Sequence, residues 1–117
     1  MVNWGVIGCG GIADRRTIPG LVQASNARLL AVMDQVPEVT KKVRAKYSCP
    51  RSYDTVAELL ADRDIDAVYI ATPVFVHAEQ VMAAAAAGKH ILVEKPLGMT
   101  VGQGREMIEA VKKAGIY

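Results

Sequence analysis

Short apolar runs recur along the chain and alternate with longer stretches in which apolar residues stand three or four positions apart. The runs are too short for globular helices, and continuous apolar runs of this kind are typical of strands buried on both faces. We therefore predict strands at residues 2–7, 28–34, 67–71 and 90–94. Residues near 51–53, which are not an apolar run, are a candidate for a further short strand, third in chain order.

The stretches between these runs carry helix patterns and helix-end signals. Pro37 stands at a first helical turn, where its missing N–H costs nothing. Asp54 and Thr100 are the predicted N-caps of two later helices, and Gly88 and Gly115 are predicted to end helices. The predicted helices run from the glycine-rich turn to about residue 24, with a break at Pro19, and over residues 37–47, 55–63, 75–87 and 101–114.

A regular alternation of strand and helix predicts parallel strands joined by right-handed crossovers. The predicted fold class is α/β, a doubly wound parallel sheet of the Rossmann type with strand order 3-2-1-4-5. Residues 1–117 are expected to form one domain, with residues 116–117 at the start of a sixth strand.

The composition narrows the class of protein. The 117 residues carry a net charge of +2 and are 51% apolar, which excludes intrinsic disorder and provides no basic arm for nucleic acid or a membrane surface. No apolar run is long enough to span a membrane, and the N-terminal residues lack the features of a signal peptide. Cys9 and Cys49 fit neither a disulfide framework nor a zinc site, so we expect reduced thiols, no metal and a cytoplasmic location.

A glycine-rich turn, GCGGIA at residues 8–13, directly follows the first predicted strand. Gly8 permits the tight turn, Gly10 lets the backbone approach a pyrophosphate, and Ala13 allows the helix to pack closely on the strand. The free N–H groups near Gly11 and Ile12 then face the anion. The pattern GxGxxA between a strand and a helix predicts dinucleotide binding, with a purely structural turn as the alternative.

Asp34 ends the second predicted strand, where a carboxylate can accept hydrogen bonds from a ribose diol. Its charge would repel a 2′-phosphate, and the following Gln35, which we include in the predicted cofactor site, supplies no positive charge. NAD is therefore favoured over NADP. Arg15 and Arg16 are near in sequence and could contact phosphate, but we interpret them as a solvated helix face.

Two more motifs stand at strand ends. The segment ATPxxxH, residues 71–77, follows the fourth predicted strand, and the segment AGKHxxxEKP, residues 87–96, contains the fifth. Both strands end at the carboxyl edge of the sheet, where open α/β sheets bind ligands.

These motifs together make the sequence similar to the N-terminal domain of the glucose–fructose oxidoreductase and inositol dehydrogenase family (Gfo/Idh/MocA type), over essentially the whole chain. The resemblance implies an NAD(P)-dependent oxidoreductase that transfers a hydride between nicotinamide and a hydroxyl or carbonyl carbon of a sugar or polyol. It implies that Thr72 and Pro73 line the cofactor channel and that His77 lies near the dinucleotide. It places Glu94 and Lys95 at the nicotinamide ribose, with Lys95 beside the reacting oxygen as the candidate catalytic residue. The bond before the following proline is a candidate cis peptide.

The sequence departs from the family pattern at two points. Val74 stands where the family usually has Asn, so a side-chain hydrogen bond is lost there. Family members also carry a second α/β domain, with the main acid–base residue and the substrate wall. We expect this chain to bind NAD weakly, to be inactive alone, and to associate with a second copy through its open fifth strand.

Two other functions remain as alternatives. One is a stand-alone nucleotide-binding or interaction module without chemistry, which would account for the short length. The other is an S-adenosylmethionine-dependent methyltransferase, which also uses a glycine-rich turn and an acidic strand end. The EKP and ATPxxxH motifs are foreign to the methyltransferase, so that function ranks last.

Overall fold

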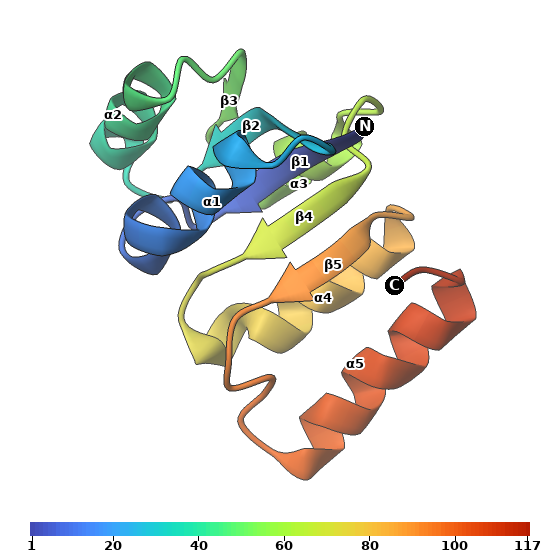
Figure 1. Cartoon of the computed structure of the whole chain (residues 1–117). Coiled ribbons are helices and arrows are strands. Elements are labelled where there is room, and N and C mark those ends of the chain that lie inside the picture. Colours follow the sequence, from blue (N-terminus) through green and yellow to red (C-terminus); the bar gives the residue numbers. More distant parts are fainter.

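A computed structural model describes all residues, 1–117, and contains one five-stranded sheet (Figure 1). All strand pairs are parallel, and the order β3-β2-β1-β4-β5 is the predicted one. The fold class is thereby confirmed. The strands are β1 (Val2–Ile7), β2 (Ala27–Met33), β3 (Arg51–Tyr53), β4 (Ala67–Ile70) and β5 (His90–Val93).

Helices cover both faces of the sheet. One layer holds α1 and α2, and the other holds α3, α4 and α5 (Figure 1). In Figure 1 the face of β4 and β5 on the side of α1 carries no helix, whereas α4 and α5 lie behind it. The helical elements are a π-helical turn η1 (Ala13–Thr17), α1 (Ile18–Gln23), α2 (Pro37–Lys46), α3 (Val56–Ala61), a 3₁₀ turn η2 (Val74–Val76), α4 (His77–Ala86) and α5 (Val101–Ala114).

Successive residues of the central strands β1, β2 and β4 feed two separate cores. On β4, Val68 belongs to the core under α3, α4 and α5, whereas Tyr69 belongs to the core under α1 and α2. Period-two alternation places neighbouring side chains on opposite faces, and both faces need apolar residues when both are covered. This explains why the strands read as continuous apolar runs in the sequence.

The helix ends described here lie where the sequence predicts them, except that one N-cap is shifted by one residue. Thr100 caps α5 by accepting a hydrogen bond from Gln103 N–H at 3.1 Å. Gly115 ends that helix in the left-handed conformation. The cap of α3 is Thr55 rather than the predicted Asp54, because the Thr55 hydroxyl accepts from Glu58 N–H at 3.2 Å.

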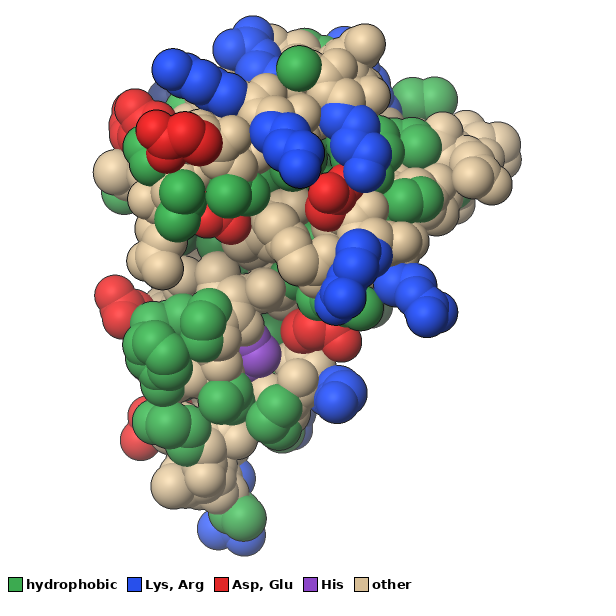
Figure 2. All heavy atoms as spheres, turned by 90° about the vertical axis from the view of Figure 1, so that its left-hand side faces the viewer, with side chains coloured by type: hydrophobic (Ala, Val, Ile, Leu, Met, Phe, Trp, Pro, Cys, Tyr) green, Lys and Arg blue, Asp and Glu red, His purple; other side chains and the backbone are tan.

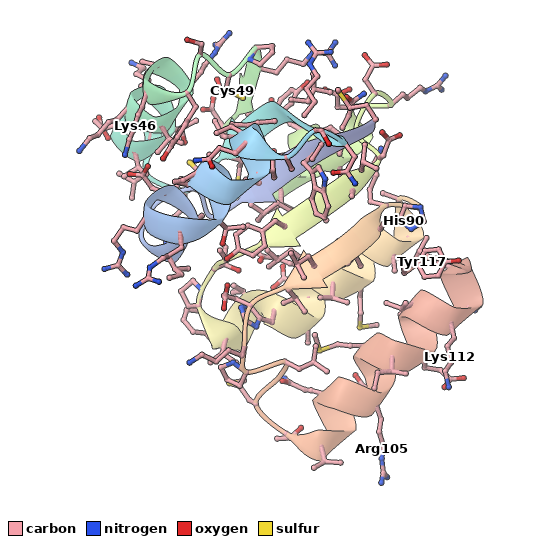
Figure 3. The ribbon with its side chains drawn as sticks, in the orientation of Figure 1. Lys46, Cys49, His90, Arg105, Lys112 and Tyr117 are labelled. Atoms are coloured by element: carbon pink, nitrogen blue, oxygen red, sulfur yellow. The ribbon has the colours of Figure 1, made fainter.

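The predicted sixth strand does not form, and β5 is an edge strand. A single rung is present, since Ile91 N–H donates to the Tyr117 carbonyl at 2.8 Å. The rings of His90 and Tyr117 lie against each other there, with centroids 5.6 Å apart (Figure 3). Leu92, in the middle of this edge strand, is 51% exposed.

No helix combines the length and the apolar character that crossing a bilayer requires.

Candidate functional site

The predicted site residues gather where the strands end. Figure 2 looks onto this carboxyl edge of the sheet, where basic side chains lie on the upper and right-hand parts and hydrophobic ones at the lower left. The glycine-rich turn follows β1, Asp34 follows β2, Thr72 follows β4, and Glu94 follows β5. Parallel topology brings these four loops to one edge although they are far apart in sequence.

The glycine-rich turn closes tightly against β2 and the loop after β4. The N–H groups of Gly8 and Cys9 both donate to the Met33 carbonyl, at 2.8 and 3.1 Å. Gly8 has a φ of +83°, and a Cβ atom there would lie 2.8 Å from Thr72 Cγ2. Only glycine fits this position, so the turn requires it for its own geometry.

Asp34 is held beside the turn with its carboxylate fixed. One carboxylate oxygen accepts from Gly10 N–H at 3.4 Å and the other from Val36 N–H at 3.0 Å. The backbone N–H of Asp34 also donates to the Thr40 hydroxyl at 3.0 Å. A Cβ atom on Gly10 would lie 3.1 Å from Val39 Cγ1, so the space over the turn exists because position 10 has no side chain.

A cavity of about 440 Å³ opens over the turn, within the size range of small-molecule sites. It brings together eight of the predicted cofactor residues, namely Gly8, Gly10, Gly11, Ile12, Asp34, Gln35, Thr72 and Pro73. Their convergence gives one end with a carboxylate, a middle formed by the glycine-rich turn, and another end formed by the loop after β4.

The rest of this cavity's wall was not predicted from the sequence. Its apolar side comprises Val39, Val56, Phe75 and Val76, and Phe75 is 65% exposed. Gln80 also lines the cavity and accepts a hydrogen bond from the Thr72 hydroxyl. No local sequence pattern marked these residues as part of the site.

His77 lies next to the cavity but does not line it. Its ring is 1% exposed, with Nδ1 2.9 Å from the Pro96 carbonyl oxygen and Nε2 2.7 Å from the Thr72 carbonyl oxygen. His77 therefore bridges the loop after β4 and the loop after β5. In the second of these loops, the Lys95–Pro96 bond is cis, as the sequence indicated.

A second cavity, also of about 440 Å³, adjoins the first. It is lined by Ile12, Arg15, Arg16, Thr17 and Glu94, and Ile12 belongs to both cavities. The two arginines are exposed, as predicted, but they also face this cavity. Lys95, the next residue after Glu94, has an exposed side chain at the same edge.

Cys9 lies inside the glycine-rich turn and takes no part in either cavity. Burial and the negative charge of Asp34 raise the pKa of its thiol to about 12. Because the thiolate is the reactive form, this cysteine is a packing residue rather than a nucleophile.

A family model described as an oxidoreductase family with an NAD-binding Rossmann fold matches residues 2–117. The chain belongs to the GFO/IDH/MocA oxidoreductase family. The resemblance stated from the GCGGIA, ATPxxxH and EKP motifs is confirmed, and the chain is an NAD(P)-binding Rossmann domain of that family.

Relatives and solved structures of this family agree with the assignment. A 1,5-anhydro-D-fructose reductase from Ensifer adhaerens is 39% identical over 99% of this chain and 34% of its own length. A dTDP-3,4-didehydro-2,6-dideoxy-alpha-D-glucose 3-reductase from Streptomyces antibioticus is 35% identical over 98% of this chain and 35% of its own. A 3-ketoreductase from Actinomadura kijaniata, solved with NADP and TDP-benzene, has a TM-score of 0.93 at 31% identity, over 98% of this chain and 35% of that one. The chain therefore spans about a third of the length of these relatives.

The residues present fit a dinucleotide. A side chain at Gly10 would fill the space over the turn, and the Asp34 carboxylate faces the same cavity. Bare backbone next to a fixed carboxylate is the donor and acceptor set that a pyrophosphate and a ribose diol require.

Proposed function

We propose that this GFO/IDH/MocA chain is the cofactor domain of an oxidoreductase that transfers a hydride between nicotinamide and a hydroxyl or carbonyl carbon of a sugar or polyol-like substrate. The observation that carries the proposal is the single cavity that joins the glycine-rich turn to the Asp34 carboxylate. When bound, the nicotinamide supplies or accepts the hydride.

Two parts of the cofactor occupy the first cavity, the pyrophosphate and the adenosine. The N–H groups near Gly11 and Ile12 donate to the pyrophosphate over the bare backbone of Gly10. Asp34 accepts hydrogen bonds from the adenosine ribose, and the apolar wall formed by Val39 and Phe75 packs against the adenine.

Asp34 supports NAD as the preferred cofactor. A 2′-phosphate bound at the ribose would face this carboxylate, and the adjacent Gln35 is uncharged. The Actinomadura kijaniata relative was solved with NADP, so the family accommodates both cofactors. We expect NADP to bind this chain more weakly than NAD, because its 2′-phosphate would face the Asp34 carboxylate.

Lys95 is the proposed catalytic residue of this domain. Lys95 is exposed and directly follows Glu94, and its ammonium group would stabilise negative charge on the substrate oxygen as the hydride moves. The groups that exchange protons with the substrate belong to the longer protein, since relatives are about three times the length of this chain. The domain spanning residues 1–117 thus binds cofactor without turning over substrate.

We also propose a partner and a compartment for the protein. The open edge of β5 supports association of the chain with a second copy, because an unpaired strand edge is a template for pairing. Cys9 and Cys49 are both free thiols, which supports a reducing, cytoplasmic compartment. No nucleic-acid partner is proposed.

Titration with NADH, monitored by nicotinamide fluorescence, tests the cofactor proposal. Binding in the micromolar to millimolar range is expected, with NADPH weaker by about tenfold or more. Asp34→Ala should weaken NADH and narrow the gap to NADPH, because the carboxylate both accepts from the ribose and repels the phosphate. Exposed Asp54→Asn is the control. Absence of NADH binding at millimolar concentration contradicts the proposal.

A further inference from the structure

The hydroxyl of Tyr69 lies at a junction of three elements. Tyr69 is on β4 and is 2% exposed, and its hydroxyl reaches Thr17 at the end of η1 and Glu94 directly after β5. A phenol buried to this extent requires hydrogen-bond partners, because an unpaired buried hydroxyl is costly.

These hydrogen bonds run in one direction. The Thr17 hydroxyl donates to the Tyr69 oxygen at 3.0 Å, and the Tyr69 hydroxyl donates to Glu94 Oε2. A carboxylate has no proton to give, so it can only accept, and this fixes the order of the chain. Burial and the hydrogen bond to Glu94 raise the pKa of Tyr69, which keeps the phenol protonated as the donor.

Glu94 is therefore held by one oxygen and free at the other. Oε2 is engaged by Tyr69, whereas Oε1 accepts no hydrogen bond from the protein, and no arginine or lysine forms an ion pair with this carboxylate. Glu94 lines the second cavity together with Arg15 and Arg16. Its unpaired oxygen is an acceptor for hydroxyl groups of a ligand there.

The two cavities meet at Ile12, which lines both. A dinucleotide with its adenosine at Asp34 and its pyrophosphate at the glycine-rich turn has its second nucleoside beyond Ile12. That second nucleoside carries a ribose diol, which is the chemistry that an oriented carboxylate accepts.

From this geometry we infer that Tyr69 is a positioning residue, which with Thr17 orients Glu94 to accept hydrogen bonds from the ribose of the nicotinamide half of the cofactor. The inference rests on the proposed function, because it requires the dinucleotide to occupy the first cavity. Tyr69 does not touch the cofactor and acts only through Glu94.

The test compares NADH with ADP, which lacks both nicotinamide and the second ribose, by titration calorimetry on this chain. Tyr69→Phe should weaken NADH by about three- to tenfold and leave ADP within about twofold, because ADP carries no second ribose that could reach Glu94. Glu94→Gln should produce the same selective loss. An equal loss for both ligands, or no loss for either, overturns the inference.

Tyr53→Phe is a matched control. Tyr53 also donates its hydroxyl to a carboxylate, Asp62 Oδ2 at 2.7 Å, but it lies outside the second cavity. This variant should lower thermal stability in the same way as Tyr69→Phe and leave the ratio of NADH to ADP affinities unchanged. An identical ratio in the two tyrosine variants would show that Tyr69 is only structural.

Thr17→Val supplies a second variant should Tyr69→Phe fold poorly. It removes the donor to Tyr69 and keeps the phenol in place, and we expect a smaller loss of NADH affinity in the same direction. A wild-type chain that binds neither NADH nor ADP overturns the proposed function and this inference with it. A chain that binds both ligands but shows no selective loss in any variant overturns this inference alone.

Discussion

His77 places its ring nitrogen Nδ1 2.9 Å from the carbonyl oxygen of Pro96. The other ring nitrogen lies 2.7 Å from the carbonyl oxygen of Thr72, so one buried ring joins the loops that carry Thr72 and Lys95. The family resemblance implied a position near the dinucleotide, and in the structure His77 contacts Thr72, which lines the cavity, without lining it itself.

Replacing this ring should loosen both loops. We expect His77→Gln to lower the free energy of unfolding by about 2 kcal/mol, because a shorter amide cannot reach both carbonyl groups. NADH affinity should fall by about threefold. Urea denaturation and fluorescence titration measure the two effects. His90→Gln, in the His90–Tyr117 contact at the far edge, should leave NADH affinity unchanged, and an equal loss there would contradict the role assigned to His77.

The three glycines of the turn should respond differently to alanine. Gly8→Ala adds a Cβ atom 2.8 Å from Thr72 Cγ2 at a φ of +83°, and should destabilise the fold by about 2 kcal/mol or more. Gly11→Ala meets no atom within 4 Å at a φ of +56° and should cost about 1 kcal/mol. Gly10→Ala should mainly weaken NADH, by about tenfold, because its methyl group occupies the space over the turn. Denaturation and NADH titration of the three variants check this order, and equal binding losses would contradict it.

Asp14 makes stability depend on pH on the acid side. The hydrogen bond from Lys46 Nζ, at 2.8 Å, lowers the pKa of this carboxyl below its ordinary value, and the Tyr47 hydroxyl adds to the effect. A carboxyl whose pKa is lower in the folded state stabilises the fold above its unfolded-state pKa, near 4, and this stabilisation is lost as pH falls through the folded-state pKa. Figure 3 shows Lys46 on α2, at the surface.

When the pH is lowered from 6 to 3, the unfolding free energy of Asp14→Asn should therefore fall less than that of the wild type. The two proteins should differ at pH 6 and converge at low pH. Urea denaturation at both values measures this, with Asp54→Asn as the control. A constant difference at every pH would show that Asp14 stabilises the fold by some other means.

The buried amino group of Lys89 stabilises the fold. It is 7% exposed, and its Nζ donates to the carbonyl oxygens of Asp62 and Ile65, both at 2.8 Å. Lys89→Met should leave both carbonyl groups without this donor and lower the unfolding free energy by about 2 kcal/mol, with NADH affinity unchanged. The exposed Lys113→Met should change neither quantity. A loss of NADH binding in Lys89→Met would place this lysine in the cofactor site.

The structural features predicted from the sequence are those for which a local pattern allows only one structure. Continuous apolar runs predicted β1, β2, β4 and β5, and alternation with helices predicted the parallel order; β3, Arg51–Tyr53, carries no such run. The carboxyl edge then collects whatever follows each strand, so Gly8, Asp34 and Thr72 could be placed together without any knowledge of side-chain contacts. Their cofactor roles stay predictions.

The parts that were not predicted depend on contacts between distant elements. Phe75 and Gln80 line the first cavity because of how η2 and α4 approach the turn, which no local pattern encodes. The link from Tyr69 to Glu94 crosses from β4 to β5 and shows no trace in the sequence, where Tyr69 is one more apolar strand residue. The Thr55 cap differs from the predicted Asp54 by one position, because both side chains can cap a helix and only the backbone geometry decides between them.

The sulfur atom of Cys9 sits in the backbone turn on which the whole cofactor proposal depends, yet its proton is held far more tightly than that of a free thiol. Oxidants and alkylating reagents attack the deprotonated sulfur, and here that form is rare and sealed from solvent. The turn should therefore keep its shape through oxidative stress, so that NADH binding survives peroxide or iodoacetamide doses that consume accessible cysteines.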